Sequence, residues 1–503
     1  MTENTASQSE RLATGVPGLD TLLHGGLVKG GVYMVMGLPG AGKTILANQV
    51  CFHHVRQGGR ALYVTLLAET HTRMISNMRA LGFFEPSRLD ESLAYLSAYS
   101  MLEEGGLDAL LALLRQETKS YRASLLVVDG LVAAEEIAPT ERAFKKFIHG
   151  LQVITAMVGC TTLLLTTGGG KGLKAEHTMV DGLFLLRQRI YGMRAVRQLT
   201  IRKFRGSGHQ HGQHTFDITG QGIIVHPRLE ALVEALVEEE RLPDPPTEGR
   251  KGFGVPGLDA MLHGGIFQGS TTMLLGSSGS GKSLVGLHFL AEGARRGELG
   301  HYFAFYDPPQ RVHAQTEGVG LDLKPLIAQG HLELSFRPPA ENRLDAIGSE
   351  LLFLIRERKV RRLFLDGFDA LSKAAIHRPR LARFMAALVN ECRARGVTLL
   401  FTAETESVFG IELTLPVRGI SMLCENLLFL RSVEVRAELR RFISILKLRT
   451  SGYDPVLREL LISNRGVQVG EPLDGAQMLM TGLSVAAPLS RASHKSRIRR
   501  RGK

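Results

Sequence analysis

The sequence has no long apolar stretch. Its longest apolar runs, such as SLLVVDGLVAA, are short, and Asp129 interrupts this one. No stretch approaches the ~20 consecutive apolar residues that a membrane-spanning helix requires, so we expect no membrane span. The first residues, MTENTASQSER, lack the apolar core of a secretory signal, and we expect none.

Cysteine is also scarce. The chain of 503 residues has four cysteines, Cys51, Cys160, Cys392 and Cys424, and no C-x-x-C pair. Scattered cysteines in a chain of this length indicate thiols that are buried rather than catalytic. We expect reduced, buried thiols and a cytoplasmic location.

Acidic residues are outnumbered, and the formal net charge is +12. The excess is local, because the last thirteen residues, RASHKSRIRRRGK, hold seven Lys or Arg and no acid. Without them the net charge falls to +5. We expect residues 481–503 to form a disordered basic tail. It could contact nucleic acid, an acidic partner or a membrane surface, or act only as a solubilising tail.

Two stretches, GLPGAGKT (37–44) and GSSGSGKS (276–283), fit the phosphate-loop pattern G-x-x-x-x-G-K-[ST]. In this pattern the backbone N–H groups surround a phosphate, the lysine reaches the β- and γ-phosphates, and the last hydroxyl ligates Mg²⁺. A strand-like run precedes each loop and a helical pattern follows, as the pattern requires. We therefore predict ATP and Mg²⁺ as cofactors. The candidate binding residues are Gly37, Gly40, Gly42, Lys43, Thr44, Gly276, Gly279, Gly281, Lys282 and Ser283.

The repetition extends well beyond the loops. GVPGLDTLLHGG (15–26) returns as GVPGLDAMLHGG (254–265), 239 residues later, which is also the separation of the two loops. A collinear duplication of this length predicts two homologous domains. We place an N-terminal tail at 1–10 and the domains at 11–242 and 251–480. Between them, Pro243, Pro245 and Pro246 mark an exposed linker at 243–250.

Within each half, apolar strand-like runs alternate with helical patterns. The alternation predicts an α/β fold, in which a mainly parallel sheet is covered by helices on both faces. Ligands of such sheets bind beyond the carboxyl ends of the strands. Asp129 in LLVVDG and Asp366 in RLFLDG end strands of this kind, and an aspartate placed there orients Mg²⁺. We expect Thr44, Ser283, Asp129 and Asp366 to be the metal ligands.

The double loop, the GVPGLD…GG lead-in and a Lys-x-Arg pair near the end of each half resemble the KaiC family of RecA-like ATPases. The similarity spans residues ~11–470. It implies tandem RecA-like P-loop NTPase domains, a double-ring homohexamer with ATP between neighbouring subunits, and slow hydrolysis. In the clock members of the family, the second domain also phosphorylates and dephosphorylates its own serine and threonine.

The cationic pairs are Lys203/Arg205 in RKFRGSG and Lys447/Arg449 in LKLRTSG. Side chains two apart on a strand share a face, so each pair presents both cations together. In a RecA-like ring such residues face the neighbour's γ-phosphate, as an arginine finger does. We add Ser207, in the same stretch, to the candidate nucleotide-binding residues. The histidines of GSGHQHGQH match no standard zinc spacing.

Two acidic positions are candidates for activating water. Glu69 follows the strand ALYVTLL in the first half, where the family has adjacent glutamates. In the second half the matching stretch is YFAFYDPPQR, which offers only Asp307 before two prolines. A shorter carboxylate on a stiff turn predicts poor turnover at the second site.

The phosphorylation segment of the clock proteins aligns with GISMLCENLLFL. Ser421 stands at the serine position, but Met422 replaces the threonine. A two-site phosphorylation cycle is therefore not expected, and Ser421 is a candidate for a single site. Its alternative is a small residue at a turn before a strand.

Three functions remain open on the sequence: a KaiC-like ATPase or kinase acting through protein partners, a RecA-like ATPase moving on DNA, and an ATP-gated scaffold without turnover. The loop TTGGGKGLKAEH (166–177) favours DNA, because Gly and Lys could meet phosphates in a ring's pore. Its counterpart in the second half, TAETESVFGIE, is acidic, which disfavours DNA.

Overall fold

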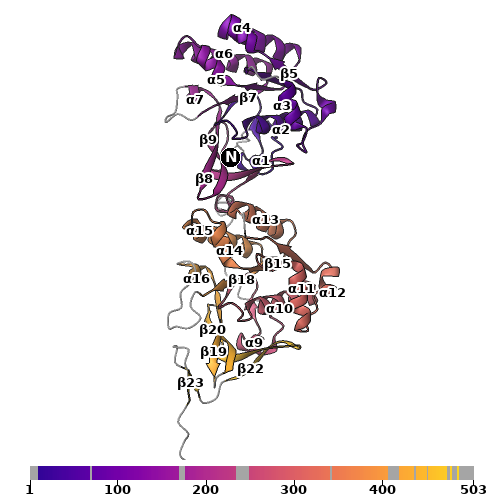
Figure 1. Ribbon diagram of the computed structural model, residues 1–503, viewed down its shortest axis with the longest axis vertical. Helices are drawn as coiled ribbons and strands as arrows, with labels where there is room; N and C mark the ends of the chain where they lie inside the picture. Colours follow the sequence, from indigo (N-terminus) through magenta and orange to yellow (C-terminus); the bar gives the residue numbers. More distant parts are fainter. Residues whose placement is uncertain are drawn as a thin grey trace, which may run out of the picture. The chain divides into compact units, whose positions relative to one another are not determined.

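The structure, a computed structural model, is shown in Figure 1 and divides into two compact units, Met1–Leu236 and Val237–Lys503. The residues it describes are 10–67, 71–168, 176–233, 249–339, 343–405, 419–435, 438–449, 451–472, 476–478 and 484–486. Most of the predicted linker, 243–248, lies outside these residues, as do most of both predicted tails. Within the predicted basic tail, Ser484–Ala486 form a strand that pairs with Ala476–Met478.

The first unit contains β1 (Arg11–Leu12), α1 (Leu19–Leu22), β2 (Leu27–Val28), β3 (Val32–Gly37), α2 (Lys43–Arg56), β4 (Ala61–Thr65), α3 (His71–Met78), η1 (Pro86–Arg88), β5 (Leu93–Ser97), α4 (Tyr99–Ser120), β6 (Leu125–Asp129), α5 (Leu131–Ile137), α6 (Glu141–Val158), β7 (Thr161–Thr166), α7 (Glu176–Met179), β8 (Gly182–Tyr191), β9 (Arg194–Phe204), β10 (Gln213–Thr219) and β11 (Gly222–His226).

The second unit contains β12 (Arg250–Lys251), α9 (Pro256–Met261), β13 (Ile266–Phe267), β14 (Thr271–Gly276), α10 (Lys282–Arg295), β15 (Gly300–Ala304), α11 (Pro309–Gly318), α12 (Lys324–Ala328), β16 (Leu332–Phe336), α13 (Leu344–Arg356), β17 (Arg362–Asp366), α14 (Phe368–Ala374), α15 (Arg380–Ala394), β18 (Thr398–Glu404), α16 (Ile420–Leu423), β19 (Asn426–Val435), β20 (Glu438–Leu448), β21 (Arg458–Ser463), β22 (Gly466–Pro472), β23 (Ala476–Met478) and β24 (Ser484–Ala486).

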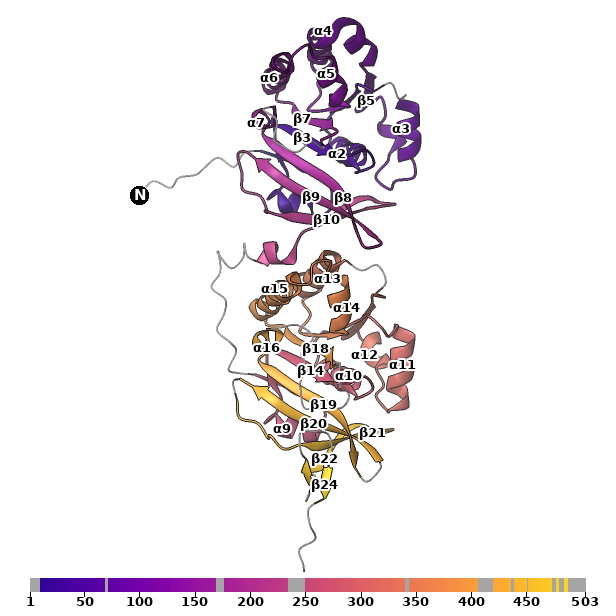
Figure 2. The same cartoon turned by 60° about the vertical axis from the view of Figure 1, so that its left-hand side comes forward.

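Each unit is built on a nine-stranded sheet. The strand order is β11-β10-β9-β8-β3-β7-β6-β4-β5 in the first and β16-β15-β17-β18-β14-β19-β20-β21-β22 in the second. In the first unit, neighbouring strands in the run β8-β3-β7-β6-β4-β5 pair in parallel. Strands β9, β10 and β11 extend this sheet beyond β8 by antiparallel pairing. Figure 2 shows β8, β9 and β10 side by side at this edge. The predicted α/β fold with tandem, mainly parallel sheets is confirmed, and the antiparallel extension is an addition to it.

The sheet of the first unit has an apolar layer on each face. Tyr63 and Val127 pack with residues of α2 on one face. Val64 and Val128, the next residue of each strand, pack with α4 and α6 on the other. Successive strand residues point to opposite faces, so strands covered on both sides are continuously apolar. This explains why β4 and β6 are buried along their whole lengths.

The repeated lead-in motif has a structural role. Asp20 accepts hydrogen bonds from the Thr14 backbone N–H at 2.9 Å and from the Thr14 hydroxyl at 2.7 Å. Asp259 likewise accepts from the Phe253 N–H at 2.6 Å. Each aspartate closes the turn that precedes the strand of a phosphate loop. The doubled GVPGLD motif therefore stabilises the entry into each domain, and it does not line either cavity described below.

The two halves differ sharply at one buried position. By strand register Leu125 of β6 corresponds to Arg362 of β17, because Leu125 pairs with Ala61 and Arg362 with Gly300. The Arg362 guanidinium is fully buried, donates to Glu298 at 2.6 Å and also to the carbonyl of Phe289 at 2.8 Å. Glu298 also pairs with Lys251, so Arg362 is one of two cations that compensate this carboxylate.

No helix among the described residues is long and apolar enough to cross a membrane.

We predict that Arg362→Ala lowers the free energy of unfolding of the second domain by about 3–5 kcal/mol, because it leaves a cavity at a fully buried position and removes one of the two cations paired with Glu298. Calorimetry should show the second domain's transition at a lower temperature. The matched control is Arg361→Ala, since Arg361 is the exposed neighbour and its loss should cost less than about 0.5 kcal/mol. Equal effects of the two substitutions would contradict this account.

Candidate functional site

The first phosphate loop joins the end of β3 to the start of α2. Gly40 and Gly42 have φ angles of +78° and +101°, in the left-handed region that L side chains rarely adopt. The Lys43 ammonium folds back over the loop and donates to the carbonyls of Gly37 at 2.7 Å and Leu38 at 3.2 Å. Burial lowers the pKa of Lys43. The loop therefore has the curvature and the cation that phosphate oxygens require.

Asp129 lies at the end of β6, beside this loop, and is 7% exposed. Its Oδ2 accepts from the Tyr63 hydroxyl at 2.8 Å and from the Thr44 hydroxyl at 3.0 Å. Burial raises the pKa of Asp129, although these two hydrogen bonds and Lys43 oppose the shift. The structure thus brings together the hydroxyl and the carboxylate predicted to hold Mg²⁺, and hard oxygen ligands of this kind suit that ion.

These groups open into a cavity of about 460 Å³. Besides the loop residues and Asp129, it is lined by the ends of neighbouring strands and helices, at Leu67, Gly130, Val132, Leu165, Thr166 and Thr167. The cavity lies beyond the carboxyl ends of the parallel strands, where sheets of this class bind ligands.

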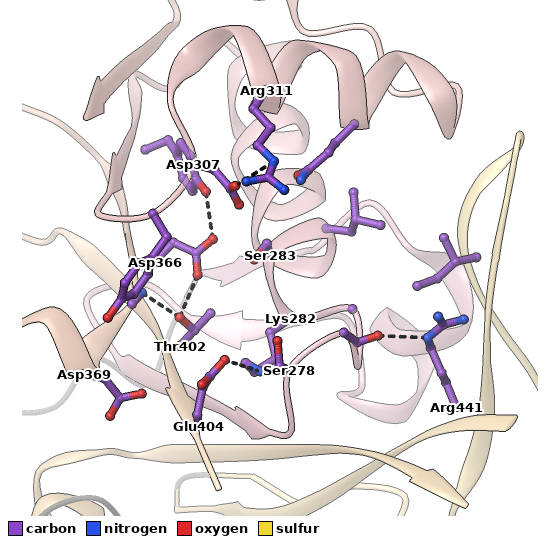
Figure 3. A pocket seen from close by; sticks show the side chains of 18 of the residues that line it. Ser278, Lys282, Ser283, Asp307, Arg311, Asp366, Asp369, Thr402, Glu404 and Arg441 are labelled. Atoms are coloured by element: carbon purple, nitrogen blue, oxygen red, sulfur yellow. Dashed lines mark hydrogen bonds and ion pairs between the residues drawn. The ribbon is translucent and has the colours of Figure 1, made fainter. Parts of the chain in front are cut away.

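The second loop repeats the arrangement with a larger cavity of about 680 Å³ (Figure 3). Lys282 is buried and donates to the carbonyls of Gly276 at 2.9 Å and Ser277 at 2.7 Å. Ser283 lines the cavity together with Asp366. Asp366 is held by the hydroxyls of Tyr302 and Thr402, each at 2.7 Å. Apart from Gly37 and Gly276, the predicted loop residues and the aspartate of each domain therefore line one cavity.

The two tyrosines are functional candidates that the sequence analysis missed. Tyr63 and Tyr302 are 239 residues apart, the same separation as the phosphate loops, and each donates to the aspartate of its site. The repeat spacing was the signal that could have found them. Nothing in the sequence, however, says that a tyrosine inside a buried strand faces a carboxylate 66 residues away.

Asp307 lines the second cavity, as predicted, but it faces a cation. Its Oδ1 lies 3.4 Å from Nε of Arg311, one helical turn away on α11. The same cavity also contains Asp369 and Glu404, which the sequence analysis did not select. The Glu69 candidate lies outside the described residues, so nothing is said of its place.

The Lys-x-Arg pairs do not line the cavity of their own domain among the residues described there. Lys203 and Arg205 both donate to the Thr178 carbonyl, at 2.6 and 3.1 Å. Lys447 donates to the carbonyls of Ser421 at 2.6 Å and Cys424 at 2.7 Å.

The remaining candidates lie apart from the cavities. Arg449 follows β20, and its backbone N–H donates to the Glu425 carbonyl at 3.1 Å. Ser207 is partly exposed, and its hydroxyl donates to the Gly208 carbonyl at 3.0 Å. Ser421 is partly buried on the short helix α16, immediately before β19. Neither serine lines the described part of either cavity.

Cysteine and histidine offer no second site in the described part of the chain. All four thiols are free and buried, as predicted, and burial raises the pKa of each. The rings of His209 and His211 lie 4.5 Å apart, whereas His214 is fully buried and accepts from the Arg228 N–H at 3.1 Å. The described residues contain no group of three or more His, Cys, Asp or Glu that could hold a metal ion.

Both halves of the chain match the family model described as "ATPase: KaiC", over residues 12–230 and 252–474. The circadian clock oscillator protein KaiC of Picosynechococcus sp. is 28% identical over 508 aligned positions, covering 98% of this chain and 95% of that protein. The circadian clock protein KaiC3 of Synechocystis sp. is 26% identical over 487 positions, covering 94% of each. The chain therefore belongs to the KaiC ATPase family, and the resemblance noted from its motifs is confirmed.

We predict that Tyr63→Phe makes ATP turnover more sensitive to acid. Asp129 can hold a metal ion only when ionised, and burial already raises its pKa above the ordinary value. The Tyr63 hydrogen bond lowers that pKa, so its loss should move the acid-side decline of activity to higher pH, by up to about one unit.

Phosphate release measured against pH checks this. Tyr95→Phe is the matched control, because its ring lies 5.3 Å from that of Tyr63 but its hydroxyl donates to Asn48. A profile that moves to lower pH, or one that moves equally in the control, would count against it.

Proposed function

We propose that this KaiC-family protein binds Mg·ATP in both domains, hydrolyses it mainly in the first, and works as a homohexamer that acts on protein partners. The observation that carries the proposal is the doubled cavity. In each domain a glycine loop, its lysine, a hydroxyl and a strand-ending aspartate face one space. These groups match the needs of a nucleotide triphosphate and its metal ion.

In the first cavity, Lys43 would bind the β- and γ-phosphates in place of the loop carbonyls it now contacts. Thr44 and Asp129 would hold Mg²⁺, which when bound neutralises charge developing on the phosphates. Hydrolysis also requires a base or a residue that orients water, and we assign this role to Glu69. Its position after β4, the neighbour of β6 in the sheet, supports the assignment.

In the second cavity, the carboxylate after the equivalent strand is Asp307. It is one methylene shorter than glutamate, follows β15 closely, and lies 3.4 Å from Arg311. A shorter carboxylate that is also held by an ion pair is less able to reach the position from which a base activates water. We therefore infer that the second domain binds ATP and turns it over slowly.

The cationic pairs support assembly. Lys203, Arg205, Lys447 and Arg449 lie near the ends of β9 and β20, away from the described lining of their own domain's cavity. Cations placed this way can serve a nucleotide held by a neighbouring subunit, as arginine fingers do. The RecA-like ring of the family provides such a neighbour, and ATP would then lie between subunits.

We predict that ATP with Mg²⁺ shifts the protein to a hexamer of about six 55.0 kDa chains, measured by light scattering. Arg205→Ala and Arg449→Ala together should weaken this shift. Arg202→Ala is the matched control, because Arg202 is an exposed arginine of the same strand that does not belong to the Lys-x-Arg pair. A monomer at saturating Mg·ATP would refute the ring.

We predict that Glu69→Gln lowers phosphate release ~10²–10⁴-fold, the usual cost of losing a general base, while ATP binding persists. Asp307→Asn should change total turnover by less than about twofold, because the second site contributes little. Filter binding with labelled ATP separates binding from chemistry. If both substitutions reduce phosphate release equally, the two sites share the work and the division proposed here fails.

Autophosphorylation at Ser421 is the second candidate activity. Lys447 contacts the Ser421 carbonyl at 2.6 Å, so a lysine proposed to face a neighbour's phosphate also holds the backbone of this serine. Met422 stands where the clock proteins have threonine, which disfavours a two-site cycle. Incubation with γ-labelled ATP, following free phosphate and protein-bound label together, separates an ATPase, an autokinase and an inert scaffold.

A DNA-dependent ATPase is the alternative. Residues 169–175 of the Gly/Lys loop and 406–412 of its acidic counterpart lie outside the described residues, as does the basic end of the chain from residue 487. Salt-dependent binding to single-stranded DNA, with DNA-stimulated turnover, would favour this alternative over protein partners.

A further inference from the structure

The two phosphate-loop lysines have different electrostatic surroundings. Nζ of Lys282 lies 3.9 Å from Oε1 of Glu404, and the Lys282 side chain is 8% exposed (Figure 3). Asp366 and Asp369 line the same cavity. In the first cavity, Asp129 is the one carboxylate among the described lining residues. The second lysine is thus already opposed by nearby negative charge.

Strand register shows where the difference arises. Glu404 ends β18 opposite Gly276, the first glycine of the second loop. In the first domain Thr166 pairs with Met36, so the residue opposite the corresponding Gly37 is Thr167, which also lines its cavity. Similarly, Asp369 stands three residues after Asp366, where the first domain has Val132 three residues after Asp129. Setting aside Glu69 and Asp307, the second cavity therefore has two carboxylates that the first lacks among the described residues, and it also has three further cations, Arg311, Lys373 and Arg441.

Glu404 reaches the cavity from the same face of β18 as Thr402, two residues earlier. Thr402 donates to Asp366 at 2.7 Å and accepts from the Gly367 N–H at 2.8 Å. This side of the strand is therefore anchored next to the metal-binding aspartate, and it directs the Glu404 carboxylate at the lysine. A phosphate group that enters the loop must share Lys282 with this carboxylate.

We propose that Glu404 makes nucleotide binding at the second site dependent on a divalent cation. This rests on the proposed function of the cavity as an ATP site. Of the other cations that line the cavity, Arg311 pairs with Asp307, Lys373 contacts the Tyr306 hydroxyl and Arg441 donates to the Gly279 carbonyl. A nucleotide without a metal ion therefore brings its full negative charge to a lysine that Glu404 already contacts, with Asp366 and Asp369 in the same cavity. A nucleotide that carries Mg²⁺ brings two positive charges to the same carboxylates. With Thr167 in place of Glu404, the first site accepts both forms.

The test uses the full-length protein and a labelled, non-hydrolysable imido analogue of ATP in equilibrium dialysis. With Mg²⁺, the wild-type chain should bind two analogue molecules. With EDTA in place of Mg²⁺, it should bind one tightly, and Lys282→Ala, which removes the second site's binding, identifies the event that was lost. Because Glu404 is about half exposed, solvent screens the pair, and we expect the second site to weaken at least about tenfold in EDTA.

Glu404→Thr copies the first site and should restore the second binding event in EDTA. Glu404→Asp keeps the charge and serves as the matched control, in which the dependence on Mg²⁺ should persist. Thr167→Glu is the reciprocal change and should make the first site dependent on Mg²⁺. Asp369→Val, which also copies the first site, should act in the same direction as Glu404→Thr and provides a second variant if that one does not fold.

The outcomes are distinguishable. Two tight binding events in EDTA for the wild-type chain, or a dependence on Mg²⁺ that Glu404→Thr and Asp369→Val both leave unchanged, would overturn the role of Glu404 while leaving the two ATP sites intact. No binding of the analogue at either site with Mg²⁺ would instead refute the proposed function.

Discussion

A carboxylate buried at the end of a parallel strand costs free energy unless hydrogen-bond donors or a cation compensate it. Asp129, which is buried, and Asp366, which is partly buried, occupy this position. Tyr63 and Tyr302 donate to them from the neighbouring strand. Donors on the helix after the loop, or on the strand beyond, complete the set. The aspartate therefore links the phosphate loop to the centre of the sheet, and a metal ion held there would be aligned with the lysine.

The completing donor differs between the domains. In the first it is Thr44, the last residue of the loop itself, whereas in the second it is Thr402 of β18. Leu165 lines the first cavity from the corresponding strand and cannot donate. Consequently the aspartate of the first site already contacts the hydroxyl with which it would share a metal ion. In the second site, Asp366 accepts from Thr402 of the neighbouring strand, and the loop hydroxyl of Ser283 lines the cavity. Two homologous domains thus position the loop hydroxyl and the strand-ending aspartate through different hydrogen bonds.

Two of the differences between the halves introduce charged side chains. Arg362 replaces a buried leucine and ties β17 to Glu298, and Glu404 replaces a threonine opposite the loop. Neither change alters the strand order, which is the same in both sheets. Charge can therefore vary inside a conserved frame, with effects on stability at one position and on ligand binding at the other.

The sequence by itself determined the features that depend on neighbours along the chain. The glycine loops, the strand before each and the helix after each are local patterns, and the repeat made both domains visible. The sequence also indicated Asp129 and Asp366, because an apolar run that ends in aspartate marks the carboxyl edge of the sheet. The antiparallel strands β9 to β11, the tyrosines behind the aspartates and the place of Glu404 were decided only by the tertiary structure. They depend on which strands pair and in which register, and register brings together residues as far apart as Lys282 and Glu404 through contacts that no short stretch of sequence contains.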